Sequence, residues 1–530
     1  MALISKKSLL SFDVDRIKNY VFATQDLASI RGASAILHKL NGEMSKIISL
    51  VAPEVEQVYA DGGSGLFLLD TKNVEAAKAA VSCHYRSKTV TASITGASVE
   101  ITDEKQIIDQ LELLPYRLRA AKERVSPSKD MVSSSLMKTC ESCGSGYVSK
   151  SNLGPEGMEF VCLSCYLKKR KDRSLKEQIP NYFSSNFRPE ADGAPSLWQD
   201  LSNILKEREY GGYPDRQKFD RPNDFNELGE LSTPSGYIGL IVADGDNMGQ
   251  VFDQFGSLGE YKDFARILDQ SLYDALANSI IKHLQPSMGS NVLPFDVLLL
   301  AGDDLIMVTR AESVLPVALR LVEEFSSLSR GHGHELRLSA SVVIAHAKYP
   351  FQAAHRIAES GLRFAKQKAH ELKMQGQPCN TGLINFLVLN NPSFLDFYGI
   401  YNSEFKAMAN DGLTSNIRTL RPYSTQMLLN LIRAAQDLKG APSTRLYQLA
   451  EACYQDRNNS KLNGFAVVHR WKENSIKEVQ VIENLFDQIR QEQGFTGRNA
   501  FPWLVDEKDN HYTPLVDLLE LFDFVKGGAL

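Results

Sequence analysis

Two acidic turns hold the residues whose types and spacing could do chemistry. Asp244 and Asp246 follow an apolar run, and Asp303 and Asp304 follow Gly302 between two further apolar runs. Each pair lies where a strand is expected to end, so on neighbouring strands the carboxylates would converge. Carboxylate oxygens are hard ligands suited to Mg²⁺ or Mn²⁺, and two such ions support nucleotidyl transfer. Ordinary hairpin chemistry remains the alternative explanation for either turn alone.

Nucleotidyl transfer requires a 3′-hydroxyl to attack an α-phosphate in line while pyrophosphate leaves. Asp244 and Asp303 are the best candidates for the metal ligands. Asp304 and Asp246 would complete or orient the cluster. Side chains alternate in direction along a strand, so we do not expect all four carboxylates to face one ion.

Four of the seven cysteines have the spacing of a zinc ribbon: Cys140 and Cys143, then eighteen residues, then Cys162 and Cys165. Each CxxC turn can aim two thiolates at one ion, and Gly144 gives the first turn its flexibility. A four-thiolate site leaves no open position for water, so the predicted Zn²⁺ is structural. Two unrelated pairs of free or redox-active thiols are the alternative.

Composition sets wide bounds on the protein. A chain of 530 residues suggests three or four domains, and a net charge of −5 offers no global attraction to nucleic acid. Contacts with RNA would therefore require local basic patches. We find no secretory signal and no apolar run near the length of a membrane span, so we expect a cytoplasmic protein without a membrane partner.

The order of predicted elements suggests the same motif twice. The later copy reads strand 237–243, helix 248–284, strands 297–300 and 305–308, helix 313–328 and strand 336–346. The earlier copy reads strand 9–14, helix 16–50, strands 55–60 and 66–69, helix 74–85 and strand 89–101. This β-α-β-β-α-β order predicts an α+β chain with two ferredoxin-like palm domains.

The remaining segments complete a four-domain prediction. A polar stretch rich in Pro, Gly and Asp predicts a long loop or boundary between Pro180 and Pro234. Apolar residues at helical spacing predict C-terminal helices at 424–435, 443–454, 476–493 and 515–524. The predicted domains are a degenerate first palm at 1–110, a zinc-ribbon and helical linker domain at 111–232, a second palm at 233–390 and a helical domain at 391–530.

These residues carry a family resemblance that covers most of the chain. The motifs are FDVDRIKNYVF and YADGGSGLFLL in the first palm, CESCG and CLSC in the ribbon, and ADGDNMG, LLAGDDLIMV and SASVVIAHAKYP in the second palm. In this order they resemble the large polymerase-like subunit of type III CRISPR effector complexes. The resemblance implies synthesis of cyclic oligoadenylates from ATP when target RNA is bound. It also implies guide RNA and the other effector subunits as partners.

The resemblance extends to individual residues. GGDEF-like cyclases carry an Ala-Lys pair that reaches a triphosphate, and Lys366 after Ala365 resembles it. The glycine-rich turn at Gly62, Gly63 and Ser64 lacks paired carboxylates, so we expect it to let backbone approach a second nucleotide, with Ser64 as a hydrogen-bond partner.

Two departures from the family pattern matter. The usual Gly-Gly-Asp-Asp turn has Ala301 at its first position, which would matter if that residue needed positive φ or an open approach to a nucleotide. Many relatives begin with an HD nuclease domain, whereas none of the ten histidines here precedes an aspartate. We therefore expect no DNA cleavage by that route.

Other charged groups are weaker candidates. Asp13 and Asp15 echo the acidic strand end, but no acidic hairpin stands opposite them. Basic segments at 117–124 and 168–173 could meet a phosphate backbone or could simply be solvated. The histidines at 332 and 334 are best explained as incidental loop residues.

Two other functions remain open at this point. One is an inactive scaffold subunit of the same complex; the other is a stand-alone palm-domain cyclase. ATP turnover separates the scaffold from the synthase, and dependence on partners separates the synthase from the stand-alone enzyme.

Overall fold

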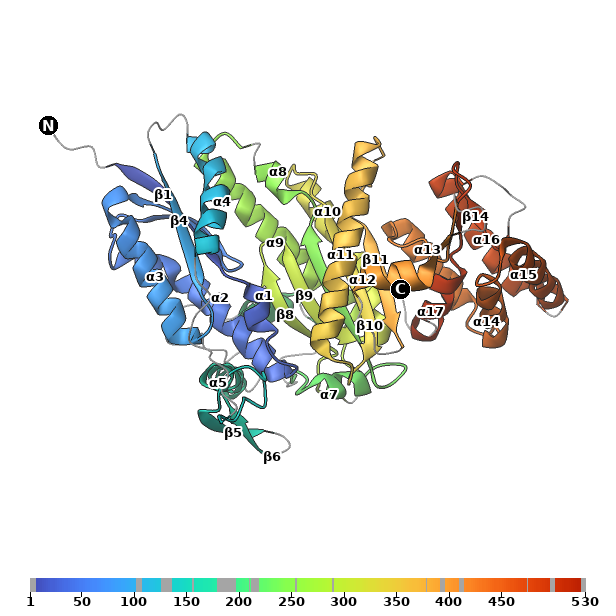
Figure 1. Ribbon diagram of the computed structural model, residues 1–530, viewed down its shortest axis with the longest axis horizontal. Coiled ribbons are helices and arrows are strands. Elements are labelled where there is room, and N and C mark those ends of the chain that lie inside the picture. Colours follow the sequence, from blue (N-terminus) through green and yellow to red (C-terminus); the bar gives the residue numbers. More distant parts are fainter. Residues whose placement is uncertain are drawn as a thin grey trace. The chain divides into compact units, whose positions relative to one another are not determined.

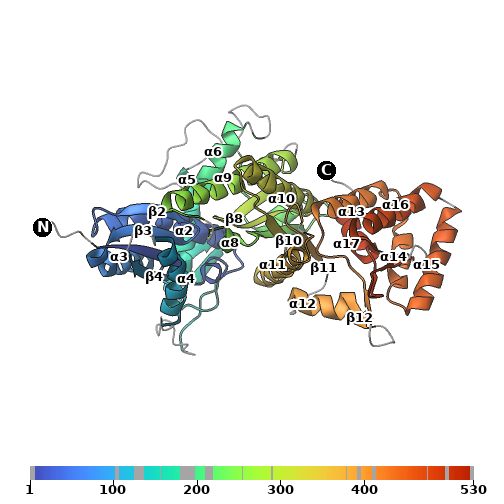
Figure 2. The ribbon, with the colours of Figure 1, turned by 90° about the horizontal axis from the view of Figure 1, so that it is seen from above.

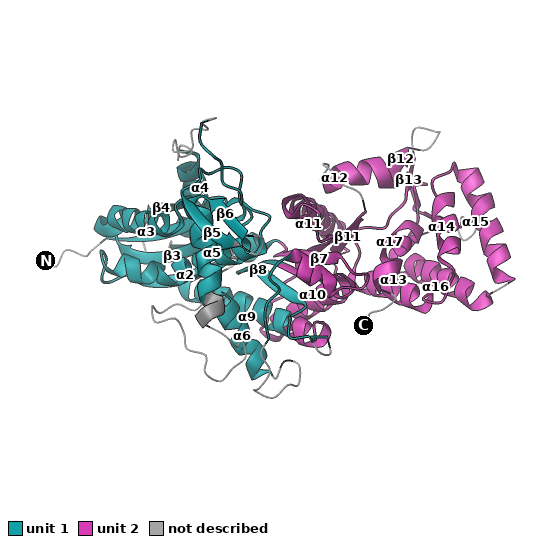
Figure 3. Cartoon of the chain, turned by 90° about the horizontal axis from the view of Figure 1, so that it is seen from below, with its two compact units in different colours: residues 1–224, 247–277, 285–306 teal, residues 225–246, 278–284, 307–530 magenta. Residues whose placement is uncertain are grey.

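The computed structural model describes residues 6–101, 107–124, 136–154, 157–178, 197–208, 210, 219–252, 255–287, 290–377, 379–390, 396–408, 414–473, 475–495 and 501–525. The chain divides into two compact units (Figure 3). Unit 1 comprises residues 1–224, 247–277 and 285–306, and unit 2 comprises residues 225–246, 278–284 and 307–530. Among the described residues, no helix is long and apolar enough to cross a bilayer.

The first palm, drawn in blue in Figure 1, opens unit 1. Its elements are β1 (Lys7–Val14), α1 (Ile17–Val21), α2 (Leu27–Ser49), β2 (Glu56–Asp61), β3 (Ser64–Asp70), α3 (Val74–Thr89) and β4 (Ile94–Glu100). The sheet order is β2-β3-β1-β4, and β1 is antiparallel to both β3 and β4. This order confirms the predicted ferredoxin-like arrangement.

Two helices replace the single helix predicted at 16–50. The segment between α1 and α2 ends at Asp26, whose side chain accepts a hydrogen bond from the Ser29 backbone N–H at 3.1 Å. This contact satisfies one of the N–H groups that lack partners at the start of a helix. The cap therefore fixes where α2 begins.

The rest of unit 1 contains the ribbon and several helices. Its elements are α4 (Ile107–Arg124), β5 (Lys150–Gly154), β6 (Gly157–Val161), α5 (Leu163–Gln178), α6 (Leu197–Glu207), α8 (Met248–Phe252), most of α9 (Leu258–His283) and β8 (Phe295–Ala301). β5 and β6 form an antiparallel hairpin next in sequence to α5. The loop predicted between Pro180 and Pro234 is wrong at α6 and at α7 (Phe225–Glu230); the segments 179–196 and 211–218 lie outside the described residues.

Gly32 lets α2 and α5 approach closely. A Cβ atom at this position would lie 1.8 Å from the backbone oxygen of Lys168. No side chain fits at that distance, so only glycine allows the two helices to pack backbone against backbone. α2 therefore contacts α3 and α5.

Most of the second palm lies in unit 2. Its elements there are β7 (Tyr237–Gly245), the end of β9 (Asp304–Arg310), α10 (Val314–Gly331), β10 (Leu338–His346), α11 (Phe351–Met374) and β11 (Ile384–Leu389). The five-stranded sheet has the order β11-β10-β7-β9-β8. β10 is antiparallel to β7 and parallel to β11. The sequence analysis missed β11, a short run that is buried on both faces.

The C-terminal part of unit 2 is mainly helical, as predicted. Its elements are α12 (Phe397–Ile400), a π-helix (Tyr401–Phe405), β12 (Lys406–Met408), β13 (Ser415–Ile417), α13 (Thr425–Asp437), α14 (Ser443–Ala452), α15 (Arg457–Lys472), α16 (Ile476–Gln493), β14 (Leu504–Val505), β15 (His511–Tyr512) and α17 (Leu515–Val525). Figure 2 shows α13 to α17 gathered together. The small sheet β12-β13-β15-β14 and helix α15 were not predicted.

Candidate functional site

The acidic turn of unit 1 joins β8 to β9 and is held by the first palm. Gly302 has a φ of 61°, and its N–H donates to Oδ2 of Asp61 at 3.1 Å. Lys18 of α1 lies 3.1 Å from Oδ2 of Asp304, a carboxylate that is 23% exposed. The turn is therefore fixed at its backbone, while its carboxylates remain partly open.

Ala301 does not require the backbone freedom of the glycine that it replaces. The described non-glycine residues with positive φ are Arg16, Val90, Asn247 and Asp509, and Ala301 is not among them. Substitution by alanine therefore causes no backbone strain at this position.

The glycine-rich loop of the first palm packs on this turn. Gly62 has a φ of 64°, and a Cβ there would lie 3.2 Å from the Cβ of Ala301. With its amide oxygen facing the loop, Asn41 accepts hydrogen bonds from the backbone N–H groups of Gly62 and Gly63. The Ser64 hydroxyl donates to the backbone oxygen of Asp61 at 3.1 Å. These groups fix the loop, and their predicted contact with a nucleotide stays a prediction.

A second carboxyl group supports Asp61. Burial, and next the charge of Asp61, raise the pKa of Asp269 in α9 to about 8. At neutral pH Asp269 is therefore protonated and can donate a hydrogen bond to Asp61. Asp61 also accepts the hydrogen bond from the N–H of Gly302.

In unit 2, β7 presents the other acidic pair. Lys366 of α11 lies 2.6 Å from Oδ2 of Asp244. Ser339 of β10 donates to Asp246 at 2.8 Å, and burial raises the pKa of Asp246 to about 6. Asp244 is the more accessible carboxyl group of the two, and Asp246 is the more buried, supporting one. Lys368 of the same helix is exposed.

The acidic residues of the first palm already have partners. Lys122 of α4 forms an ion pair with Asp13 and lies 3.8 Å from Asp15. The Asp15 carboxylate also accepts hydrogen bonds from the hydroxyls of Ser93 and Thr95, at 2.7 and 2.9 Å. The single cation of Lys122 therefore offsets at most one of the two carboxylate charges.

The four ribbon cysteines come together as predicted. Their sulfur atoms all lie within 4.8 Å of one another, and Sγ of Cys143 is 3.9 Å from Sγ of Cys162. A tetrahedral ion with Zn–S bonds of about 2.3 Å separates its ligands by about 3.8 Å. Hydrogen bonding between neighbouring thiols lowers the pKa of Cys143 and raises that of Cys165. The donor set therefore fits structural Zn²⁺.

The basic run 168–173 lies on helix α5 and contains both buried and exposed residues. Lys168 donates to the Tyr20 backbone oxygen at 2.6 Å and lies over the ring of Tyr20. Lys169 forms ion pairs with Asp26 and Glu159. These two lysines support the fold, whereas Arg170 is exposed.

Sequence reasoning missed several residues near the acidic turn. Lys18, Asn41, Asp61 and Asp269 were not assigned to the candidate site. Their contacts with it span many residues of sequence and become visible only once the palm is folded. The one available signal is that Lys18 lies inside the motif FDVDRIKNYVF.

Comparisons with known proteins agree with this geometry. Residues 237–373 match the family model described as Cas10/Cmr2, second palm domain. This segment is therefore similar to the second palm domain of that family. A search of curated proteins finds no match.

Solved structures show a similar fold over nearly the whole chain. Csm1 of T. onnurineus matches with a TM-score of 0.57 at 13% identity, over 98% of this chain and 70% of that one. The Csm1–Csm4 cassette in complex with cA4 gives the same values. The cassette in complex with AMPPNP matches with a TM-score of 0.55 at 14% identity, over 98% of this chain and 69% of that one. At these identities the comparison establishes the fold.

Proposed function

We propose that this chain is the large subunit of a type III CRISPR effector complex and converts ATP into cyclic oligoadenylates when target RNA binds the guide RNA. The observation that carries the proposal is the acidic Gly302–Asp304 turn, held open beside Lys18 in a Cas10-like fold. Similar solved structures contain cA3, cA4, pppApA and AMPPNP, which are cyclic products, a linear intermediate and an ATP analogue of such a reaction.

Divalent cations suit the residues present. The proposed ligands are Asp244, Asp303 and Asp304, since carboxylate oxygens are preferred by Mg²⁺ and Mn²⁺. Asp244 lies near the end of β7, Asp303 lies in the turn before β9, and Asp304 begins β9. Such ions, when bound, activate the attacking hydroxyl and neutralise the leaving pyrophosphate.

Two lysines are placed to bind the triphosphate. Lys18 and Lys366 each pair with a carboxylate, at 3.1 and 2.6 Å. A triphosphate carries more negative charge than one carboxylate. If metal ions bound the aspartates, the ammonium groups of both lysines could therefore bind the triphosphate instead. Their task in this proposal is to orient the α-phosphate and hold the leaving group.

The first palm contributes positioning. The protonated Asp269 supports Asp61, and Asp61 fixes the N–H of Gly302. A turn held in this way keeps its carboxylates in place before substrate binds, which lowers the cost of reaching the transition state. Ala301 agrees with an active site because its backbone is unstrained.

Product analysis tests this proposal. The chain is assayed alone, and assembled with its subunits and guide RNA, with ATP and Mn²⁺ or Mg²⁺, in the presence and absence of complementary RNA. Mass spectrometry should find cyclic oligoadenylates only in the assembled complex with target RNA. Products from the chain alone would identify a stand-alone cyclase. No product from any nucleoside triphosphate would leave the scaffold role.

A further inference from the structure

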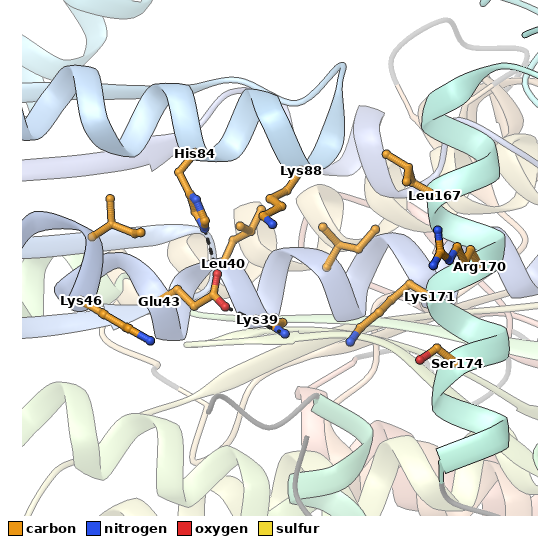
Figure 4. Close-up of a pocket in the computed structure, with 12 residues that line it drawn as sticks. Lys39, Leu40, Glu43, Lys46, His84, Lys88, Leu167, Arg170, Lys171 and Ser174 are labelled. Atoms are coloured by element: carbon orange, nitrogen blue, oxygen red, sulfur yellow. Dashed lines mark hydrogen bonds and ion pairs between the residues drawn. The ribbon is translucent and has the colours of Figure 1, made fainter. Parts of the chain in front are cut away.

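A basic groove in unit 1 lies apart from the acidic turn. Its walls are formed by α2, α3 and α5, and its cavity has a volume of about 710 Å³. Figure 4 shows His84 and Lys88 projecting from α3 toward α2, and Arg170 and Lys171 on α5.

Positive charge dominates this groove. Its lining includes the side chains of Lys39, Lys46, Lys88, Arg170 and Lys171. The only carboxylate in the lining is Glu43, which pairs with His84 at 2.9 Å and with Lys39 at 3.9 Å. Within the described chain, Lys46, Lys88 and Arg170 are exposed and have no ion-pair partner. At least these three positive charges therefore remain available in the groove.

The helices that form the walls are packed firmly together, so the backbone positions of the cationic residues are fixed. Gly32 brings α2 against α5, and Arg31 on α2 forms a two-pronged ion pair with Asp172 on α5, at 2.8 and 3.1 Å. Arg170 and Lys171 come directly before Asp172 in the sequence, and both line the groove. A preorganised array of cations binds a polyanion at lower entropic cost than flexible ones would.

The spacing of the cations fits a chain of phosphates. Lys39 and Lys46 are seven residues apart on one helix, which is about 10 Å along its axis. Lys88 and Arg170 stand on two other helices. One small anion would engage only part of this array, whereas a sugar-phosphate backbone passes several charges along it. A volume within the range of roughly 300–1,000 Å³ for small-molecule pockets admits one strand.

The other lining residues argue against base recognition. Ile36, Leu40, Ile47 and Leu167 are aliphatic, and the one ring in the lining, the His84 imidazole, is paired with Glu43. Recognition of single strands by stacking needs aromatic rings that are open to the bases.

We propose that this groove binds the backbone of single-stranded RNA without regard to sequence. The site is independent of the proposed ATP chemistry, because no residue of the acidic turns lines it. Binding is therefore measured without ATP, and failure of one proposal leaves the other intact.

Salt-dependent binding of the full-length chain provides the test. The probe is a fluorescein-labelled oligouridylate, followed by fluorescence anisotropy over a range of salt concentrations. The test variant combines Lys46→Gln, Lys88→Gln and Arg170→Gln. The control combines Lys72→Gln, Arg86→Gln and Lys262→Gln, which removes the same charge from unit 1 outside the groove. Each lost phosphate contact should reduce the slope of log K against log salt by about 0.7, so three reduce it by about 2.

The outcomes separate the alternatives. The proposal is supported if the test variant binds RNA at least tenfold more weakly, with a smaller slope of log K against log salt, while the control binds like the wild type. Equal losses in both variants would mean general charge attraction and overturn it, as would an unchanged test variant. If the test variant no longer bound labelled polyglutamate but still bound RNA, the groove would instead be a site for an acidic protein partner. Glu43→Gln provides an opposite test, since removal of the carboxylate should tighten RNA binding.

Discussion

Arg31 offers the sharpest test of how unit 1 is held together. Its guanidinium is 1% exposed and forms a two-pronged pair with Asp172 and a 3.0 Å contact with Asp296, which is 0% exposed. Arg221 pairs with the other oxygen of Asp296. Asp296 is the second residue of β8, and the acidic turn follows the far end of this strand. We predict that Arg31→Met loosens α5 and β8 together.

The magnitude follows from burial. Loss of one partner from a buried ion pair costs about 3–5 kcal/mol, because the remaining charges stay out of water without compensation. For amides of β8 that exchange through local opening, this corresponds to exchange that is faster by roughly 150- to 5,000-fold, at about 1.4 kcal/mol per factor of ten. Arg31→Lys should fall between wild type and Arg31→Met, since a lysine cannot reproduce the two-pronged contact.

Hydrogen–deuterium exchange with mass spectrometry is the assay, because a chain of several domains does not unfold in one step. Lys46→Met is the matched control: it lies on the same helix but is exposed, and it should change stability by less than about 0.5 kcal/mol. Exchange in β8 that rises by less than about tenfold in Arg31→Met would refute the reasoning.

Three further predictions concern the pKa of Asp269, the ribbon and Ala301. The pKa of Asp269 is raised to about 8, so its contribution to stability is full below its unfolded pKa near 4 and is lost as the pH rises through about 8; Asp269→Asn should flatten the fall in melting temperature between pH 5 and 8, and an equally steep fall would contradict this. Cys143→Ser should release about one zinc ion per chain, measured with a colorimetric chelator, and open the ribbon, since Zn²⁺ supplies about 10–16 kcal/mol of apparent binding free energy; a stable ribbon without zinc would be a contrary result. Ala301→Gly should lower stability by about 0.5–1 kcal/mol in denaturant titrations and leave ATP turnover unimproved, because Ala301 is unstrained and packs near Gly62; a large gain in turnover would show that the alanine obstructs the site.

Local patterns carried the parts of the fold that were predicted correctly. Both palms, the cysteine cluster and most C-terminal helices follow from periodicity and fixed spacing, which are properties of neighbouring residues. β11 was missed because a short run buried on both faces has no alternation to reveal it. Helix α15 was missed because two positions on its buried face are Ser460 and Gly464, whereas the apolar Leu462 and Phe465 are exposed, so apolar residues do not mark the buried face.

The features that could not be predicted from the sequence depend on contacts between residues that are far apart in the chain. Lys168, Lys169 and Arg170 are alike in sequence, yet the fold buries two and exposes the third, because only one face of α5 packs on α2. Lys18 meets Asp304 across 286 positions of sequence. No local rule connects such residues, so their roles had to come from the structure.

Turnover of ATP by an Asp303→Asn variant tests the central claim most directly. The assembled complex with target RNA is given radiolabelled ATP and Mn²⁺, and Asp506→Asn, far from the acidic turns in sequence, serves as the control. If the Gly302–Asp304 turn performs the transfer, Asp303→Asn should lower product formation by at least about 100-fold while zinc content and assembly stay normal. Product formation at the wild-type rate would contradict the assignment of this turn as the active site.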